Sequence, residues 1–217
     1  MNTLPLQNDP DSVRAEYGDR RRAAVAGMRI FLAVITMLFL LFLIAFIARS
    51  QSGDWRPLTD PAAPLSRPLL LWINTLVLGL GSLALQWARV AMRYGQRGES
   101  LIGFGLGGLC ALGFIVGQLA AWWQLERWGY GVASTPSSSF FFLLTGLHGF
   151  HLLGGLLAWA VTLGGYWRGW ALARLQLRVE LCAIYWHYLL ALWLLLFLAL
   201  TSSPQTYRTI AALCGLG

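Results

Sequence analysis

Three histidines are the residues in this sequence with the clearest capacity for chemistry. His148 and His151 lie three residues apart in the apolar stretch 144–155, and His187 ends a second stretch that begins at Glu180. A helix turns by about 100° per residue, so residues three apart share a face. Two imidazoles on one helix and a third on a neighbouring helix could bind copper, zinc or haem iron. Alternatively, each histidine could hydrogen-bond a neighbouring helix or a lipid phosphate, because a polar group inside a membrane needs a partner.

The acid near the third histidine also has more than one interpretation. Glu180 follows Arg178 at the start of a late apolar run. It could hold a proton or pair with an arginine that binds lipid, or it could be a helix N-terminal acid stabilised by the helix dipole by about 0.3–1 kcal/mol. In the earlier stretch, three glycines predict a thin helix that another helix approaches closely. These are Gly146, Gly149 and Gly154.

The counts of possible ligands limit the redox chemistry. A membrane cytochrome with two haems needs four axial ligands, and three histidines cannot supply them. The three cysteines, Cys110, Cys182 and Cys214, are isolated and show no metal-ligand spacing, so we interpret them as small packing residues.

Composition predicts a membrane protein. The 217 residues are 57% hydrophobic and only 12% charged, whereas a soluble domain has about 25% charged residues. Several apolar runs exceed the length of ~18 residues that is typical of a membrane helix. Since backbone groups in lipid must bond internally, these runs are expected to be helices, and no alternating pattern suggests a barrel.

We therefore predict an all-α integral membrane bundle of five helices. Residues 1–22 form a polar cytoplasmic tail, residues 23–203 the membrane domain and residues 204–217 a short C-terminal tail. The predicted spans are about 24–48, 69–90, 101–125, 140–166 and 179–201.

Arginine placement predicts the orientation. The net charge is +7, and the basic residues lie at the ends of apolar runs, which favours membrane anchoring over nucleic-acid binding. Five arginines fall on one side: Arg49, Arg56, Arg67, Arg127 and Arg208. Eleven fall on the other: Arg14, Arg20, Arg21, Arg22, Arg29, Arg89, Arg93, Arg97, Arg168, Arg174 and Arg178. The positive-inside rule then predicts a cytoplasmic N-terminus and a periplasmic C-terminus.

The two histidine stretches resemble subunit III of the haem-copper respiratory oxidases. That family carries a Thr-Gly-Phe-His-Gly-x-His element, followed later by Glu and then Tyr-Trp-His. Leu147 stands where the family usually has Phe. The matching residues are Thr145, Gly146, His148, Gly149, His151, Glu180, Tyr185, Trp186 and His187, and Asn74, Thr75 and Gln118 match the family as well.

The resemblance implies the short five-helix form of a non-catalytic subunit in the bacterial cytoplasmic membrane. The complex would reduce oxygen to water and translocate protons, with its haem and copper in partner subunits and none in this chain. The chain would pack mainly on subunit I, and also contact subunit II and smaller subunits. It would bind phospholipid and support proton uptake and stability. In the family, the residues matching His148 and His151 pack the bundle and line lipid sites, and the residue matching Glu180 is a buried structural residue near them. The same implied structural or lipid-binding role extends to Tyr185, Trp186 and His187. A contact is expected between Glu180 and a histidine of the fourth span. Interhelical hydrogen bonds are expected at four further polar residues, Asn74, Thr75, Gln118 and Thr145.

Two departures from the family keep another assignment open. The family's first core helix often carries an acid where residues 34–36 have none, and a Glu after the third-span Gln is replaced by Ala121. An accessory protein of nitric oxide reductase has the same five-helix plan and needs no such acids. A small membrane scaffold or transporter is an alternative of another class, although few polar residues are present to line a transport path.

Overall fold

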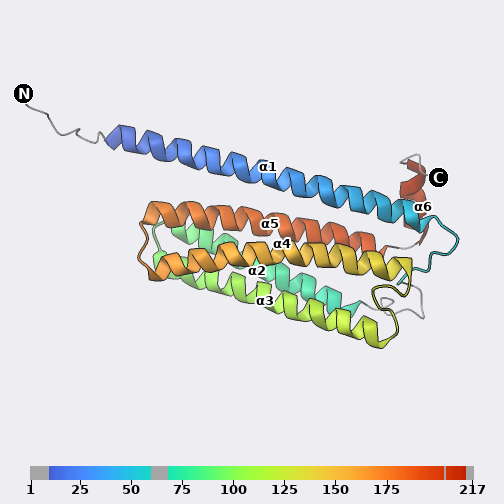
Figure 1. Cartoon of the computed structure of the whole chain (residues 1–217). Coiled ribbons are helices and arrows are strands. Elements are labelled where there is room, and N and C mark those ends of the chain that lie inside the picture. The colour runs from blue at the N-terminus through green and yellow to red at the C-terminus, as the bar shows by residue number, and fades with distance from the viewer. Residues whose placement is uncertain (1–9, 60–67, 203, 214–217) are drawn as a thin grey trace, which may run out of the picture.

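The structure is a computed structural model that describes residues 10–59, 68–202 and 204–213, and within these ranges every regular element is a helix. Figure 1 shows long helices lying side by side, with successive helices running in opposite directions. The helices are α1 (Pro10–Ser50), α2 (Leu69–Arg93), α3 (Arg97–Arg127), α4 (Pro136–Trp167), α5 (Leu172–Thr201) and α6 (Pro204–Leu213). The polar residues 1–9, Arg67 and Cys214 lie outside the described residues.

Five of these helices, α1 to α5, are long and apolar enough to cross a membrane. This confirms the predicted all-helical, multi-pass architecture. Helix α1 begins at Pro10, inside the stretch expected to be a polar tail, because arginine, alanine and glutamate favour helix even without an apolar face. Residues 204–213, also expected to be a tail, form the short helix α6.

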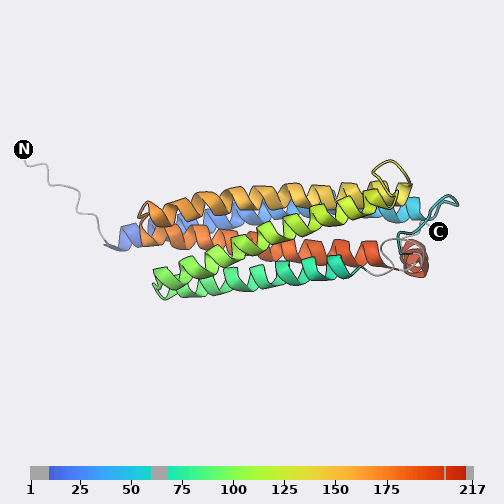
Figure 2. The ribbon, with the colours of Figure 1, turned by 90° about the horizontal axis from the view of Figure 1, so that it is seen from below.

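Helices α2 to α5 form a four-helix bundle, and α1 packs on its outside against α4 and α5. Figure 2, seen from below, shows α5 between α1 and α2, while α3 runs obliquely from beside α2 toward α4. The far end of α1 is fixed by an aromatic cluster in which the ring of Phe46 lies 5.3–5.7 Å from the rings of Trp55, Phe140 and Tyr207. The buried residues of α1, including Phe39 and Phe46, face the bundle.

Close helix approach occurs at other glycines than those predicted. A Cβ on Gly103 of α3 would lie 2.9 Å from the backbone oxygen of Ala84 of α2, so these helices touch backbone to backbone. Among the predicted glycines, a Cβ on Gly146 would make an ordinary contact with the ring of Trp122 of α3 at 3.5 Å. A Cβ on Gly149 or Gly154 would meet no atom of the described residues within 4 Å. Within the described part of the chain, the predicted close approach is therefore wrong for Gly149 and Gly154.

Local signals fix where the helices begin and end. Thr135 caps α4: its side chain accepts a hydrogen bond from the Ser138 backbone N–H, and the Ser138 hydroxyl accepts one from the Thr135 backbone N–H. Gly95, Gly129 and Gly169 follow α2, α3 and α4 with φ of 74°, 84° and 68°. This left-handed conformation, which glycine adopts without strain, turns the chain into the next helix.

Candidate functional site

Glu180 on α5 is the centre of an ion cluster that joins three helices. Its Oε2 accepts a hydrogen bond from Nε of Arg21 at 2.8 Å, and its Oε1 accepts one from Nη2 of the same arginine at 2.6 Å. Arg89 and Arg93 of α2 donate to Oε1 at 3.0 and 3.4 Å. The residue is only 5% exposed, so a charged group that would be costly alone is surrounded by donors.

These partners differ from the expected ones. Helix α5 begins at Leu172, so Glu180 lies more than two turns inside the helix and is not an N-terminal acid. Its interhelical hydrogen bonds go to arginines of α1 and α2, and no histidine of α4 contacts it in the hydrogen bonds of the described residues. The sequence predicted only a role in membrane topology for Arg21, Arg89 and Arg93, although the i, i+4 spacing of Arg89 and Arg93 is a signal that they share a helix face.

A basic cleft of about 610 Å³ adjoins this cluster between α1, α2 and α5. Four arginines line it, together with Glu180 as its one acid. These are Arg21, Arg22, Arg29 and Arg89. Positive charge is therefore in excess in the lining of this cleft.

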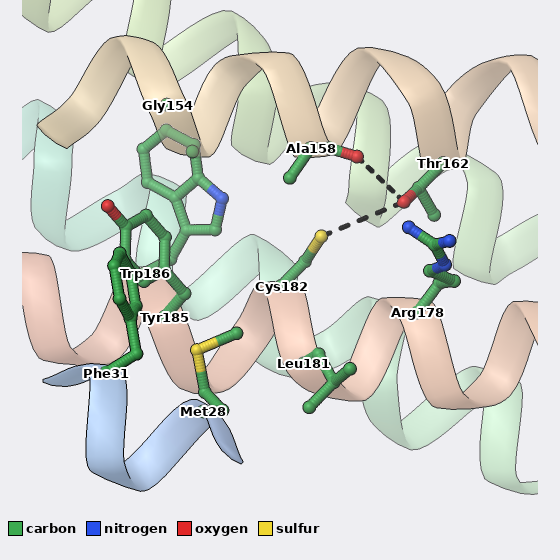
Figure 3. A pocket seen from close by; sticks show the side chains of 11 residues that line it. Met28, Phe31, Gly154, Ala158, Thr162, Arg178, Leu181, Cys182, Tyr185 and Trp186 are labelled. Atoms are coloured by element: carbon green, nitrogen blue, oxygen red, sulfur yellow. Dashed lines mark hydrogen bonds between the residues drawn. The ribbon is translucent and has the colours of Figure 1, made fainter. Parts of the chain in front are cut away.

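A second cleft, of about 260 Å³, lies on the other flank of α1 between α4 and α5 (Figure 3). Its walls include Met28, Phe31 and Trp186, and Arg178 lies at one end. Gly154 also lines this cleft, and no atom of the described residues lies within 4 Å of where its Cβ would be. The Thr162 hydroxyl, which lies near Arg178, already donates to the Ala158 carbonyl at 2.8 Å. The cleft thus offers apolar walls with one cation at the end.

His148 lies in the centre of the bundle and is 0% exposed. Its ring is 5.8 Å from the ring of Phe114 on α3 and 5.3 Å from that of Trp193 on α5. Neither ring nitrogen has a hydrogen-bond partner among the described residues. The imidazole therefore packs as an aromatic ring in an aromatic cage.

His151 faces α1 instead. Its ring lies 5.5 Å from the ring of Phe39, and its Nδ1 donates to the Leu147 carbonyl at 2.8 Å. The Tyr185 hydroxyl donates to the His151 carbonyl at 2.9 Å, which ties α5 to α4. Trp186 is buried beside Gly155, where an added Cβ would contact both Tyr185 and Trp186.

His187 contacts α2 and neither of the other histidines. Its Nδ1 is hydrogen-bonded to the Ser82 hydroxyl, and its Nε2 lies 3.1 Å from Oε1 of Gln86. Ser82 and Gln86, four residues apart on α2, were missed in the sequence, although polar residues at that spacing in an apolar run are a signal for an interhelical contact.

The four predicted interhelical polar residues divide into two pairs. Thr75 accepts a hydrogen bond from Nε1 of Trp193 at 2.9 Å, and Thr145 accepts one from Nε1 of Trp122 at 3.1 Å, so both threonines join two helices. Asn74 and Gln118 are buried, but the Asn74 amide nitrogen and both Gln118 amide atoms have no partner in the described part of the chain.

The three histidines thus point to three different places. Across the described ranges, no group of three or more His, Cys, Asp and Glu side chains is placed to hold a metal ion. Glu180, His187, Tyr185, Thr75 and Thr145 instead make hydrogen bonds between helices, and the two clefts beside α1 are open. This arrangement suits packing and binding.

Comparison with known proteins identifies the family. The family model for cytochrome c oxidase subunit III matches residues 19–202, which include both histidine stretches and the Glu180 cluster. The chain belongs to this family. A cytochrome c oxidase subunit 3 from Synechocystis sp. is 29% identical over 91% of this chain and 85% of its own length. One from Thermostichus vulcanus is 29% identical over 80% and 84%.

A relative with a different electron donor in its name also matches. The cytochrome bo(3) ubiquinol oxidase subunit 3 of Pseudomonas aeruginosa is 26% identical over 58% of this chain and 60% of its own length. The resemblance to haem-copper oxidase subunit III is confirmed. A member of this family is a multi-pass membrane protein and a partner of other oxidase subunits.

Proposed function

We propose that this chain is the non-catalytic subunit III of a bacterial haem-copper terminal oxidase. The observation that carries the proposal is the family match over residues 19–202. The complex would reduce oxygen to water and translocate protons, while this chain packs on subunit I and contacts subunit II and smaller subunits. The dispersal of His148, His151 and His187 to separate helix contacts supports a chain without its own redox centre.

The proposed orientation puts the Glu180 cluster at the cytoplasmic side. Helix α1 begins, α2 ends and α5 begins at this end of the bundle (Figure 1). Arg21, Arg89, Arg93 and Arg178 all lie there, which supports a cytoplasmic N-terminus and a periplasmic C-terminus in the bacterial inner membrane.

The two clefts beside α1 are the proposed phospholipid sites. An acyl chain would lie along the apolar walls of the α1–α4–α5 cleft, with its phosphate near Arg178. The basic cleft on the other flank would bind a second anionic head group through Arg22 and Arg29. Basic pockets between membrane helices on the cytoplasmic side are suited to such head groups. Lipid in these clefts would hold α1 to the bundle and so stabilise the complex.

Support of proton uptake is proposed to be indirect. Residues 34–36 and Ala121 provide no acid in the membrane, and at this level the Thr36 hydroxyl instead lies 2.9 Å from the hydroxyl of Tyr188. The chain would therefore act by holding subunit I and its lipids in place, since its early helices carry no membrane acid to pass a proton.

Purification through a tag on this chain in mild detergent tests the function. Co-purified haem with oxygen uptake is the expected result. Haem with nitric oxide reduction and no oxygen uptake would assign the chain to a nitric oxide reductase instead. A colourless single chain would contradict membership of any such complex.

Native mass spectrometry of the same preparation tests the lipid sites. We expect bound phospholipid, and less of it in Arg178→Gln and in an Arg22→Gln/Arg29→Gln variant. Arg208→Gln, at an exposed arginine on α6 far from both clefts, is the control. Equal lipid in all variants would reject the assignment of these clefts.

A further inference from the structure

A groove of about 550 Å³ runs between α2 and α5 on the side away from α4. We call it the α2–α5 groove, and Figure 2 shows the two helices that form it side by side. Leucines on both helices line it, and Leu76, Leu80 and Leu83 are exposed. At Gly79 no atom lies within 4 Å of where a Cβ would stand, so a neighbour could come close to the α2 backbone there.

A chain of polar groups runs out into this groove. The acceptor Oε1 of Gln86 lies 3.1 Å from Nε2 of His187, so Nε2 carries the hydrogen and donates it. Nδ1 is then the lone-pair nitrogen, and it accepts from the Ser82 hydroxyl. This series of hydrogen bonds therefore ends at the amide nitrogen of Gln86, which is an exposed residue. The two N–H donors of that amide have no partner among the described residues.

The position of this group shows what could satisfy it. Gln86 lies seven residues before Arg93, the last residue of α2, so it is about 10 Å inside the helix end at ~1.5 Å per residue. It is still within the apolar run of α2, where lipid tails offer no acceptor. Polar groups there face protein, because facing lipid is costly.

We propose that the α2–α5 groove is the docking surface for a membrane helix of a partner subunit, which brings a hydrogen-bond acceptor to Gln86 within the apolar run of α2. The acceptor is a carboxylate, amide or hydroxyl oxygen. Hydrogen-bond complementarity selects an acceptor, because the exposed Gln86 amide presents N–H donors in the groove. The inference rests on the proposed function for the partner, the haem-bearing subunit.

Photocrosslinking in the intact complex tests the groove. A photoreactive residue is placed at Leu83, which lines the groove and is 68% exposed, and for comparison at Leu109 of α3, which is 65% exposed and does not line it. The expected result is an adduct between Leu83 and the haem-bearing subunit, with only lipid adducts from Leu109. Lipid adducts alone at Leu83, or an adduct with a second copy of this chain, would overturn the proposal.

A variant tests the hydrogen bond itself. Gln86→Leu should raise the apparent Kd for rebinding of the chain to a complex depleted of it by about three- to twenty-fold, the range of one interhelical hydrogen bond in a membrane. Gln124→Leu, which removes an exposed amide from α3, is the matched control and should change nothing. An unchanged Kd for Gln86→Leu would contradict the role of the amide.

The haem content of the tagged wild-type preparation separates the two proposals. Haem in that preparation without a Leu83 adduct to the haem-bearing subunit would reject the groove and leave the function standing. No haem in it would reject the function, and the partner assignment with it.

Discussion

Arg21 of α1 donates two parallel hydrogen bonds, of 2.6 and 2.8 Å, to the carboxylate of Glu180 of α5, which lies 159 residues later in the sequence. A two-bond arginine–carboxylate pair fixes orientation as well as distance. Helix α1 lies outside the four-helix bundle, so this pair and the aromatic cluster around Phe46 tie its two ends.

Removing the Glu180 charge should therefore loosen α1. Glu180→Gln leaves three arginines without their carboxylate. Arg21 and Arg93 are partly exposed, so the expected loss of unfolding free energy is about 1–3 kcal/mol, between that of a surface pair and that of a buried one. Thermal unfolding in detergent measures it. Glu99→Gln, at an exposed acid in the first turn of α3, is the control and should cost at most ~1 kcal/mol. Equal effects would show that the Glu180 cluster adds no stability.

His148 should behave as a packing residue. Since neither ring nitrogen has a partner among the described residues, His148→Leu removes polar atoms that gain nothing and should change the unfolding free energy by less than ~1 kcal/mol. His148→Ala opens a cavity and should cost about 2–4 kcal/mol. If Leu proves as damaging as Ala in the same unfolding assay, the imidazole nitrogens have a partner such as an ordered water.

The hydrogen bond between Trp193 and Thr75 should couple α5 to α2. A double-mutant cycle with Thr75→Val and Trp193→Phe should give a coupling energy of about 0.6–1.7 kcal/mol. The control is Thr201→Val, because the Thr201 hydroxyl donates to the carbonyl of Phe197 in its own helix. This variant should show no coupling to Trp193→Phe. A coupling energy of zero in the first cycle would show that this hydrogen bond does not hold α5 to α2.

Glycines on α3 offer a matched pair. Gly103→Ala puts a methyl group 2.9 Å from the backbone oxygen of Ala84, which cannot move without shifting α2, and should cost about 1–3 kcal/mol. Gly105→Ala meets no atom within 4 Å and should stabilise the helix by up to ~1 kcal/mol. Chemical or thermal unfolding of both variants measures the two changes in unfolding free energy. Changes of the same sign would contradict the close α2–α3 contact.

Sequence patterns predicted the helices far better than their neighbours. Length and apolar composition identify the spans that became α2 to α5, because each must satisfy its backbone alone in lipid. The partners of Glu180 depend on which helices meet, and Arg21 is 159 residues away. His148 and His151 were predicted to share a face, but three residues turn a helix by about 300°. The remaining difference of about 60° is enough for one ring to face α3 and α5 and the other α1.

The most direct measurement compares the oxidase purified with and without this chain, by haem spectrum and by oxygen uptake followed over time. We predict the same haem content per catalytic subunit and similar initial oxygen uptake, with earlier loss of activity when the chain is absent. Loss of a haem or metal in proportion to the chain removed would contradict it, because the chain would then carry a redox centre of its own.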